Sequence, residues 1–149
     1  MTREILAINP GSTSTKLGVF ADGNEIMTEN LSHSADELAG FAAVSDQLPY
    51  RLAKIREFLN NNGLSLRDFA AVVARGGLLK PILGGTYAVN AAMLDDLRQA
   101  RYGAHAANLG AILADQLAAE AAIPAYIVDP PVVDELDDVA RVTGLPEIK

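Results

Sequence analysis

The alternation of apolar and polar residues predicts three short strands at the start of the chain. Residues 5–8 form an apolar run that suits a buried strand and is too short for a helix. An Asn-Pro-Gly turn signal follows at 9–11, and a second apolar run occupies 17–20. After a glycine-centred turn at 21–24, residues 24–32 predict a third strand with polar outer positions. We expect this third strand to lie at an edge of a sheet.

Helical spacing replaces this pattern after residue 45. The first predicted helix begins at Ser45 or Asp46, has Pro49 in its first turns and ends at Gly63. Its apolar positions recur at helical spacing and are expected in the core: Leu48, Leu52, Ile55 and Leu59. Its basic residues are expected on a solvated face: Arg51, Lys54 and Arg56.

The second half of the chain alternates apolar strands with helices. Residues 70–74 and 125–128 are short apolar runs typical of buried strands, and 86–89 predict a brief strand. Asn90 caps a second helix, and a third helix opens at 105–108. The inner face of this third helix is predicted as Leu109, Ile112, Leu113 and Leu117. The order predicts an α/β fold with a mixed sheet, antiparallel in its first three strands and joined afterwards by helical crossovers.

The first turn carries the richest candidate chemistry. Hydroxyl residues at 12–15 and then Lys16 follow Gly11. Hydroxyls, backbone N–H groups and a lysine can converge on phosphate oxygens, so the turn is a candidate anion cradle. A P-loop is excluded, because no glycine precedes Lys16, no Ser or Thr follows it, and no helical pattern comes next. An ordinary polar hairpin is the alternative interpretation of the turn alone.

Two strand ends add candidate residues. Arg75 ends an apolar strand, and Gly76 and Gly77 leave room for a ligand near the backbone. The guanidinium of Arg75 can grip a carboxylate or phosphate with two hydrogen bonds, although an arginine in a surface loop is the alternative. Asp129 follows the strand at 125–128, at the sheet edge where open α/β sheets bind ligands.

The two histidines receive different expectations. His33 lies among Ser and Asp residues and is expected in a solvent-exposed loop. His105 lies near a predicted helix start, whose positive dipole end favours neutral imidazole. On this evidence His105 is either a functional or a structural histidine. The acidic segment 134–138 is expected to be exposed, since its spacing is not that of a metal-binding loop.

Composition narrows the possible partners. The chain has 149 residues, half of them apolar, which is enough for one domain with a sizeable core. A net charge of −7 argues against nucleic acid and anionic membrane surfaces as partners. Cysteine is absent, which excludes disulfides, thiolate metal sites and a cysteine nucleophile. No apolar run has the length of a signal peptide or membrane span, so a cytoplasmic protein is expected.

Several motifs in one order resemble butyrate kinases. These enzymes are related to acetate kinases within the group of actin-like, sugar-kinase-like and heat-shock-ATPase-like folds. The motifs are Asn-Pro-Gly-Ser-Thr-Ser-Thr-Lys at 9–16, Ala-Arg-Gly-Gly-Leu-Leu-Lys-Pro at 74–81, Gly-Gly-Thr-Tyr at 84–87, Tyr-Gly-Ala-His at 102–105, Asn-Leu-Gly at 108–110, Val-Asp-Pro at 128–130 and Val-Asp-Glu-Leu at 133–136. The resemblance implies a ribonuclease-H-like lobe of the actin-like ATPase fold.

The resemblance also implies roles for individual residues. Asn9, Ser12 and Ser14 would lie near the transferred phosphoryl group and its Mg²⁺, Arg75 would hold the carboxylate substrate, and His105 would face the phosphoryl group. Asp129 would lie at the metal side, so the implied Mg²⁺ ligands are Asn9 and Asp129. The remaining phosphate-binding candidates of the turn are Gly11, Thr13 and Lys16. The implied ligands are ATP, Mg²⁺ and butanoate or a related short acid, and the full-length enzyme is expected to be a homo-oligomer.

An acyl pocket can be suggested from the same register. Acetate kinases tend to have Val and Leu where this chain has Gly77 and Ala104. Two smaller residues, beside Gly76, predict room for a longer acyl tail.

Those kinases are about twice as long as this chain, with adenosine and second phosphate motifs in a C-terminal lobe. We therefore expect residues 1–149 to form a single N-terminal lobe that is inactive as a kinase alone. The alternatives are a lobe of an acetate or propionate kinase, and a non-catalytic phosphate-binding module on the same fold.

Overall fold

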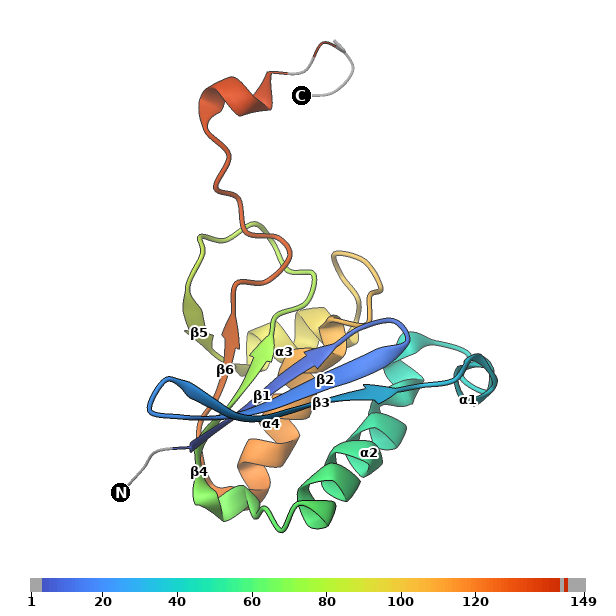
Figure 1. The fold of residues 1–149 in the computed structure, drawn as a ribbon. Coiled ribbons are helices and arrows are strands. Elements are labelled where there is room, and N and C mark those ends of the chain that lie inside the picture. The colour runs from blue at the N-terminus through green and yellow to red at the C-terminus, as the bar shows by residue number, and fades with distance from the viewer. Residues whose placement is uncertain (1–3, 143, 145–149) are drawn as a thin grey trace.

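The computed structural model describes residues 4–142 and 144, which form a mixed sheet of six strands with helices packed against it (Figure 1). The strands are β1 (Glu4–Pro10), β2 (Ser14–Ala21), β3 (Asn24–Ser32), β4 (Phe69–Arg75), β5 (Thr86–Ala88) and β6 (Ala125–Val128). Their order across the sheet is β3-β2-β1-β4-β6-β5. β1, β2 and β3 pair antiparallel, whereas β1, β4 and β6 are parallel. The predicted mixed sheet and its edge strand β3 are confirmed.

Helices connect the parallel strands. They are α1 (Ala35–Ala39), α2 (Leu48–Asn61), α3 (Ala91–Arg98) and α4 (Asn108–Ala121), with 3₁₀ turns η1 (Val44–Gln47), η2 (Leu66–Asp68) and η3 (Asp138–Arg141). The side chain of Asn90 caps α3, as predicted, by accepting a hydrogen bond from the Met93 N–H. No helix of the described part of the chain is long and apolar enough to span a membrane.

The main core lies between the sheet and the helices α2 and α4 (Figure 1). β1 buries Leu6 and Ile8 on this side, while Ile5 and Asn9, which point the other way, are exposed. The predicted apolar faces of both helices are largely confirmed in this core and in the smaller cluster beside it: Leu52, Ile55, Leu59, Leu109, Ile112, Leu113 and Leu117 are buried. Leu48, also predicted in the core, is half-buried and packs against both clusters. The sheet face away from this core is where Asn9 emerges.

Helix boundaries differ from the prediction near residue 45. Ser45 and Asp46 belong to the 3₁₀ turn η1, and α2 begins at Leu48 with Gln47 as its N-cap. A short helix, α1, was not predicted, although Ser34 and Glu37 form the capping box that marks a helix start. Gly63 closes α2 with a positive φ of 67°, as expected.

Two expectations of solvent exposure were wrong. His33 is only 3% exposed, because its ring hydrogen-bonds to Thr15 and Tyr50. Arg51 is fully buried, because its guanidinium finds hydrogen-bond acceptors in the turn between β1 and β2. The predicted exposure of the 134–138 segment is confirmed.

Candidate functional site

The carboxyl ends of the three parallel strands bring candidate residues together at one edge of the sheet. Asn9 lies near the end of β1, Arg75 ends β4, and Asp129 follows β6. Lys16 of β2 pairs with Asn9 across the antiparallel ladder. All of them line a pocket of about 430 Å³ on the open side of the sheet. Three separate segments of the chain, the β1–β2 hairpin, the end of β4 and the end of β6, thus contribute to one site.

The walls of this pocket include residues that were not predicted. β2 contributes Gly18 and Phe20, and β3 contributes Glu25 and Thr28. Lys16, Gly18 and Phe20 alternate along β2, which puts them on the same face of the sheet. For Gly18 and Phe20 the sequence signal was this period of two, counted from Lys16.

Two hydrogen bonds with Gly85, one from the backbone and one to the side chain, hold Asp129 in place. Its φ is +39°, in the left-handed region, and its N–H donates to the Gly85 carbonyl at 3.1 Å. Its carboxylate Oδ1 accepts the Gly85 N–H at 2.7 Å. This pair of bonds ties the segment before β5 to the end of β6 and fixes the position of the carboxylate.

The backbone carbonyls of residues 11–14, at the turn between β1 and β2, all accept hydrogen bonds from donors of the protein. Arg51 donates to the carbonyls of Gly11, Ser12 and Ser14, at 2.9, 3.3 and 2.9 Å. The backbone N–H of His33 donates to the Thr13 carbonyl at 2.8 Å. Ser12 and Thr13 are exposed, and within the described residues their N–H groups donate to no protein acceptor. Donors rather than acceptors therefore remain free for a ligand at this turn.

Sequence reasoning missed the residues that support the turn. Arg51 also donates to the Thr15 hydroxyl at 2.9 Å, and Gln47 accepts two hydrogen bonds from its guanidinium. Burial lowers the pKa of Arg51, yet a guanidinium stays protonated in proteins. Burial, and then the charge of Arg51, lower the pKa of His33. The available signal was position: Gln47, Arg51 and Leu52 fall near the face of α2 that turns toward the sheet.

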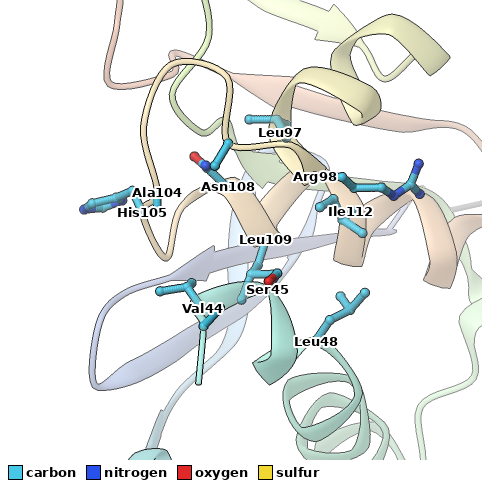
Figure 2. Close-up of a pocket in the computed structure, with 12 residues that line it drawn as sticks. Val44, Ser45, Leu48, Leu97, Arg98, Ala104, His105, Asn108, Leu109 and Ile112 are labelled. Carbon is cyan, nitrogen blue, oxygen red and sulfur yellow. The ribbon is translucent and has the colours of Figure 1, made fainter. Parts of the chain in front are cut away.

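His105 lies apart from the pocket that contains Arg75. It is exposed, precedes α4 and borders a second cavity of about 290 Å³. Figure 2 shows Ala104 and His105 on the loop before α4, across this cavity from Leu48 and Arg98. The His105 Nδ1 accepts the Ala107 N–H at 3.1 Å, which puts the proton of the neutral ring on Nε2. The Nε2–H group of His105 is therefore left to donate a hydrogen bond to a ligand.

The room predicted at Gly77 is filled. A Cβ placed on Gly77 would lie 2.5 Å from Cα of Asn108, and one on Gly76 would lie 2.7 Å from Cβ of Pro130. Both glycines are buried and allow close packing rather than leaving open space. The buried side chain of Asn108 secures this contact: it accepts the Leu78 N–H and donates to the Gly103 carbonyl, both at 2.8 Å. Of the predicted acyl-pocket residues, Ala104 alone lines one of these two cavities.

The pocket offers few metal ligands of its own. Within residues 4–142 and 144, no group of three or more His, Cys, Asp and Glu side chains is placed to hold a metal ion. Asn9 and Asp129 do line the same pocket. One carboxylate and one amide suit Mg²⁺, which keeps several waters and takes further oxygens from substrate phosphates.

The sequence of this chain is about half identical to those of several curated proteins. It is 50% identical over 144 residues to butyrate kinase 1 of Clostridium acetobutylicum, a match that covers 97% of this chain and 41% of that protein. It is 47% identical over 144 residues to a probable butyrate kinase of Listeria monocytogenes, with the same coverage. The chain is similar to butyrate kinases. The resemblance predicted from the motifs is thus confirmed, and the chain spans about two fifths of the length of these butyrate kinases.

Solved structures share the fold at low identity. Acetate kinase of Porphyromonas gingivalis superposes with a TM-score of 0.61 at 13% identity, over 97% of this chain and 41% of that one. A propionate kinase of Francisella tularensis gives a TM-score of 0.56 at 15% identity, with the same coverage. No family model matches the chain. The α/β fold of the acetate kinase type is confirmed for this butyrate kinase-like chain.

Proposed function

We propose that this chain is the acyl- and phosphoryl-binding lobe of a butyrate kinase. The reaction would transfer a phosphoryl group between ATP and butanoate or a related short acid, giving an acyl phosphate and ADP. The observation that carries the proposal is the shared pocket of Asn9, Lys16, Arg75 and Asp129 at the sheet edge. The similarity to butyrate kinases over 97% of the chain supports it.

The chemistry suits these residue types. A short fatty acid is ionised at neutral pH, since its pKa is near that of other carboxylic acids, so no strong base is needed. The obstacle is to bring a carboxylate into line with a phosphate, which is also negative. Arg75 and Lys16 would reduce this repulsion from the pocket, and the exposed N–H groups of Ser12 and Thr13 would donate to phosphate oxygens.

Magnesium has a place in the proposal beside Asn9 and Asp129. When bound, the ion would neutralise charge on the phosphates of ATP. Asp129 would hold it with the carboxylate oxygen that is not bonded to Gly85, and Asn9 with its amide oxygen. We assign His105 a separate role as a donor through Nε2–H to the equatorial phosphoryl oxygens.

The His105 role requires an approach between two sites. His105 and Arg75 line different cavities, so a ligand or a further part of the protein has to bridge the two cavities. We propose that the nucleotide site needs a second lobe outside residues 1–149 and that this chain alone has little or no kinase activity. The relatives' greater length supports this division.

Titration calorimetry tests the proposal on the chain itself. We expect butanoyl phosphate to bind, Mg·ATP not to bind, and Arg75→Ala to abolish the acyl phosphate signal. Arg67→Ala is the matched control, because Arg67 is exposed in η2 and borders a different surface pocket. Stoichiometric binding of Mg·ATP would place the nucleotide site in this lobe. Absence of acyl phosphate binding would leave a non-catalytic module as the better description.

A further inference from the structure

Arg51 is a buried cation without a paired anion in the described part of the chain. Its side chain is fully inaccessible to solvent, and no carboxylate of residues 4–142 and 144 forms an ion pair with it. Its partners are neutral instead: carbonyls of the β1–β2 turn, the Thr15 hydroxyl and the Gln47 amide oxygen. A buried charge is costly unless it is hydrogen-bonded and compensated, so its retention here suggests a use beyond stability.

The hydrogen bonds of Arg51 determine which way the turn presents its polar groups. Carbonyl oxygens would repel a phosphate, and those of Gly11, Ser12 and Ser14 are directed toward the guanidinium. The fourth carbonyl, that of Thr13, is occupied by the His33 N–H. The opposite, solvent side of the turn therefore carries N–H and hydroxyl donors. One side chain from α2 thus organises a loop some 40 residues earlier in the sequence.

We propose that Arg51 is a positioning residue for anion binding at the β1–β2 turn, acting through the turn backbone and through its unneutralised positive charge. The inference rests on the proposed function, in which this turn holds a phosphoryl group. Arg51 does not touch the ligand; the turn stands between them. Because the guanidinium is buried, its field is screened much less by salt than that of a surface lysine.

Gln47 makes the two effects separable. Its Oε1 accepts from both Nε and Nη2 of Arg51, at 3.1 and 2.9 Å. Gln47→Glu keeps an acceptor oxygen at that position and adds the neutralising charge, so the turn geometry should persist while the net charge behind it is lost. Arg51→Lys does the converse: it keeps the charge but loses the planar fork that reaches several carbonyls at once.

The experiment combines backbone amide NMR of the ligand-free chain with titration of butanoyl phosphate. Arg51→Lys should shift the amide resonances of Gly11, Ser12, Thr13 and Ser14 and raise the Kd about tenfold, because several hydrogen bonds are lost together. Gln47→Glu should leave those resonances nearly unchanged and raise the Kd several-fold, by nearly the same factor at low and at high salt, because salt screens a buried charge only weakly. Circular dichroism and thermal melting establish that each variant is folded.

Two matched controls lie on the same helix. Arg56→Lys repeats the first exchange at an exposed arginine that pairs with Glu120. Asn60→Asp adds one negative charge at an exposed position about 20 Å along the helix from Gln47. Neither control should alter the turn resonances or the Kd.

The outcomes separate this inference from the function on which it rests. Suppose that the chain without substitutions binds butanoyl phosphate and that the folded Arg51→Lys and Gln47→Glu variants bind it with the same affinity. This result would overturn the role of Arg51 alone. If the chain without substitutions binds no butanoyl phosphate, both the role of Arg51 and the proposed function are overturned. A loss of affinity in Arg51→Lys without any change in the turn resonances would contradict the positioning mechanism.

Discussion

The hydroxyl oxygen of Thr15 lies 2.8 Å from Nε2 of His33, and both side chains are buried. Thr15 accepts a hydrogen bond from Arg51, so its own proton is free to be donated to His33. Nε2 is then an acceptor, and the ring proton lies on Nδ1, which is 3.1 Å from the Tyr50 hydroxyl oxygen. In this arrangement the proton of the neutral His33 ring lies on Nδ1, and Thr15 connects the ring to the turn.

This arrangement predicts a loss of stability in mild acid. Burial and the nearby charge of Arg51 lower the pKa of His33 in the folded state, and Glu37 opposes them only in part. The unfolded chain, with an ordinary histidine pKa near 6.5, binds the proton first. The free energy of unfolding should thus be constant above about pH 7 and decrease as the pH falls below about 6.5. Urea denaturation across pH 5–8 measures this.

The second histidine provides the control. His33 and His105 are the two histidines of the chain, and His105 is exposed. His105→Gln should keep the decrease of stability below pH 6.5, whereas His33→Gln should remove most of it. Equal pH profiles for the unchanged chain and His33→Gln would contradict the neutral, buried state of His33.

Replacement of Arg51 by methionine should destabilise the fold strongly. Met fills a similar volume but leaves the carbonyl of Gly11 and the amide oxygen of Gln47 without their donor, while the Ser14 carbonyl keeps only the Gly11 N–H. We expect a loss of about 3 kcal/mol, since each buried polar group left unsatisfied costs on the order of 1–3 kcal/mol. Arg56→Met, at an exposed ion pair, should cost less than about 1 kcal/mol. Chemical denaturation of both variants makes the comparison, and equal losses would contradict it.

The fold was largely predictable because its elements follow local rules. The apolar runs of β1, β4 and β6, the Asn90 cap and the apolar stripe of α4 each depend on residues close in sequence. The convergence of Asn9, Arg75 and Asp129 was also accessible, since the carboxyl ends of parallel strands meet at one sheet edge. Motif resemblance then joined these separate signals.

Such local rules could not predict the burial of Arg51 and His33 or the lack of space beside Gly77. An arginine on a helix is exposed in most proteins, and only the tertiary position of the β1–β2 turn supplies the acceptors that bury Arg51. Likewise, the space beside Gly77 depends on how closely the start of α4 approaches, a distance that no sequence pattern encodes. Long-range contacts, not local propensities, decided these positions.

Enlarging Gly77 should damage packing rather than change acyl selectivity. The Cβ of Gly77→Val would lie 2.5 Å from Cα of Asn108 and 2.8 Å from Cδ2 of Leu97. Backbone cannot move aside as a flexible side chain does, so we expect a destabilisation of about 1–3 kcal/mol or more. Gly40→Ala is the tolerated control, because Gly40 has a φ of −74° and the nearest atom to its Cβ would be 3.8 Å away. A folded Gly77→Val variant of unchanged melting temperature would refute the close contact.

The charge of Asp129 can be tested apart from its structural role. Asp129→Asn keeps Oδ1 as an acceptor for the Gly85 N–H, and asparagine tolerates the positive φ of 39° at this position. The variant should therefore melt within a few degrees of the unchanged chain. If the carboxylate holds Mg²⁺ in the pocket, the dependence of butanoyl phosphate binding on Mg²⁺ should disappear in the variant.

Asp22→Asn is a matched control, since Asp22 also has a positive φ, of 50°, but lies in the β2–β3 turn and does not line the pocket. Calorimetric titrations with and without Mg²⁺ decide the point: a persistent Mg²⁺ effect in Asp129→Asn would remove Asp129 from the proposed metal site, while a large fall in melting temperature would show that its charge serves the fold.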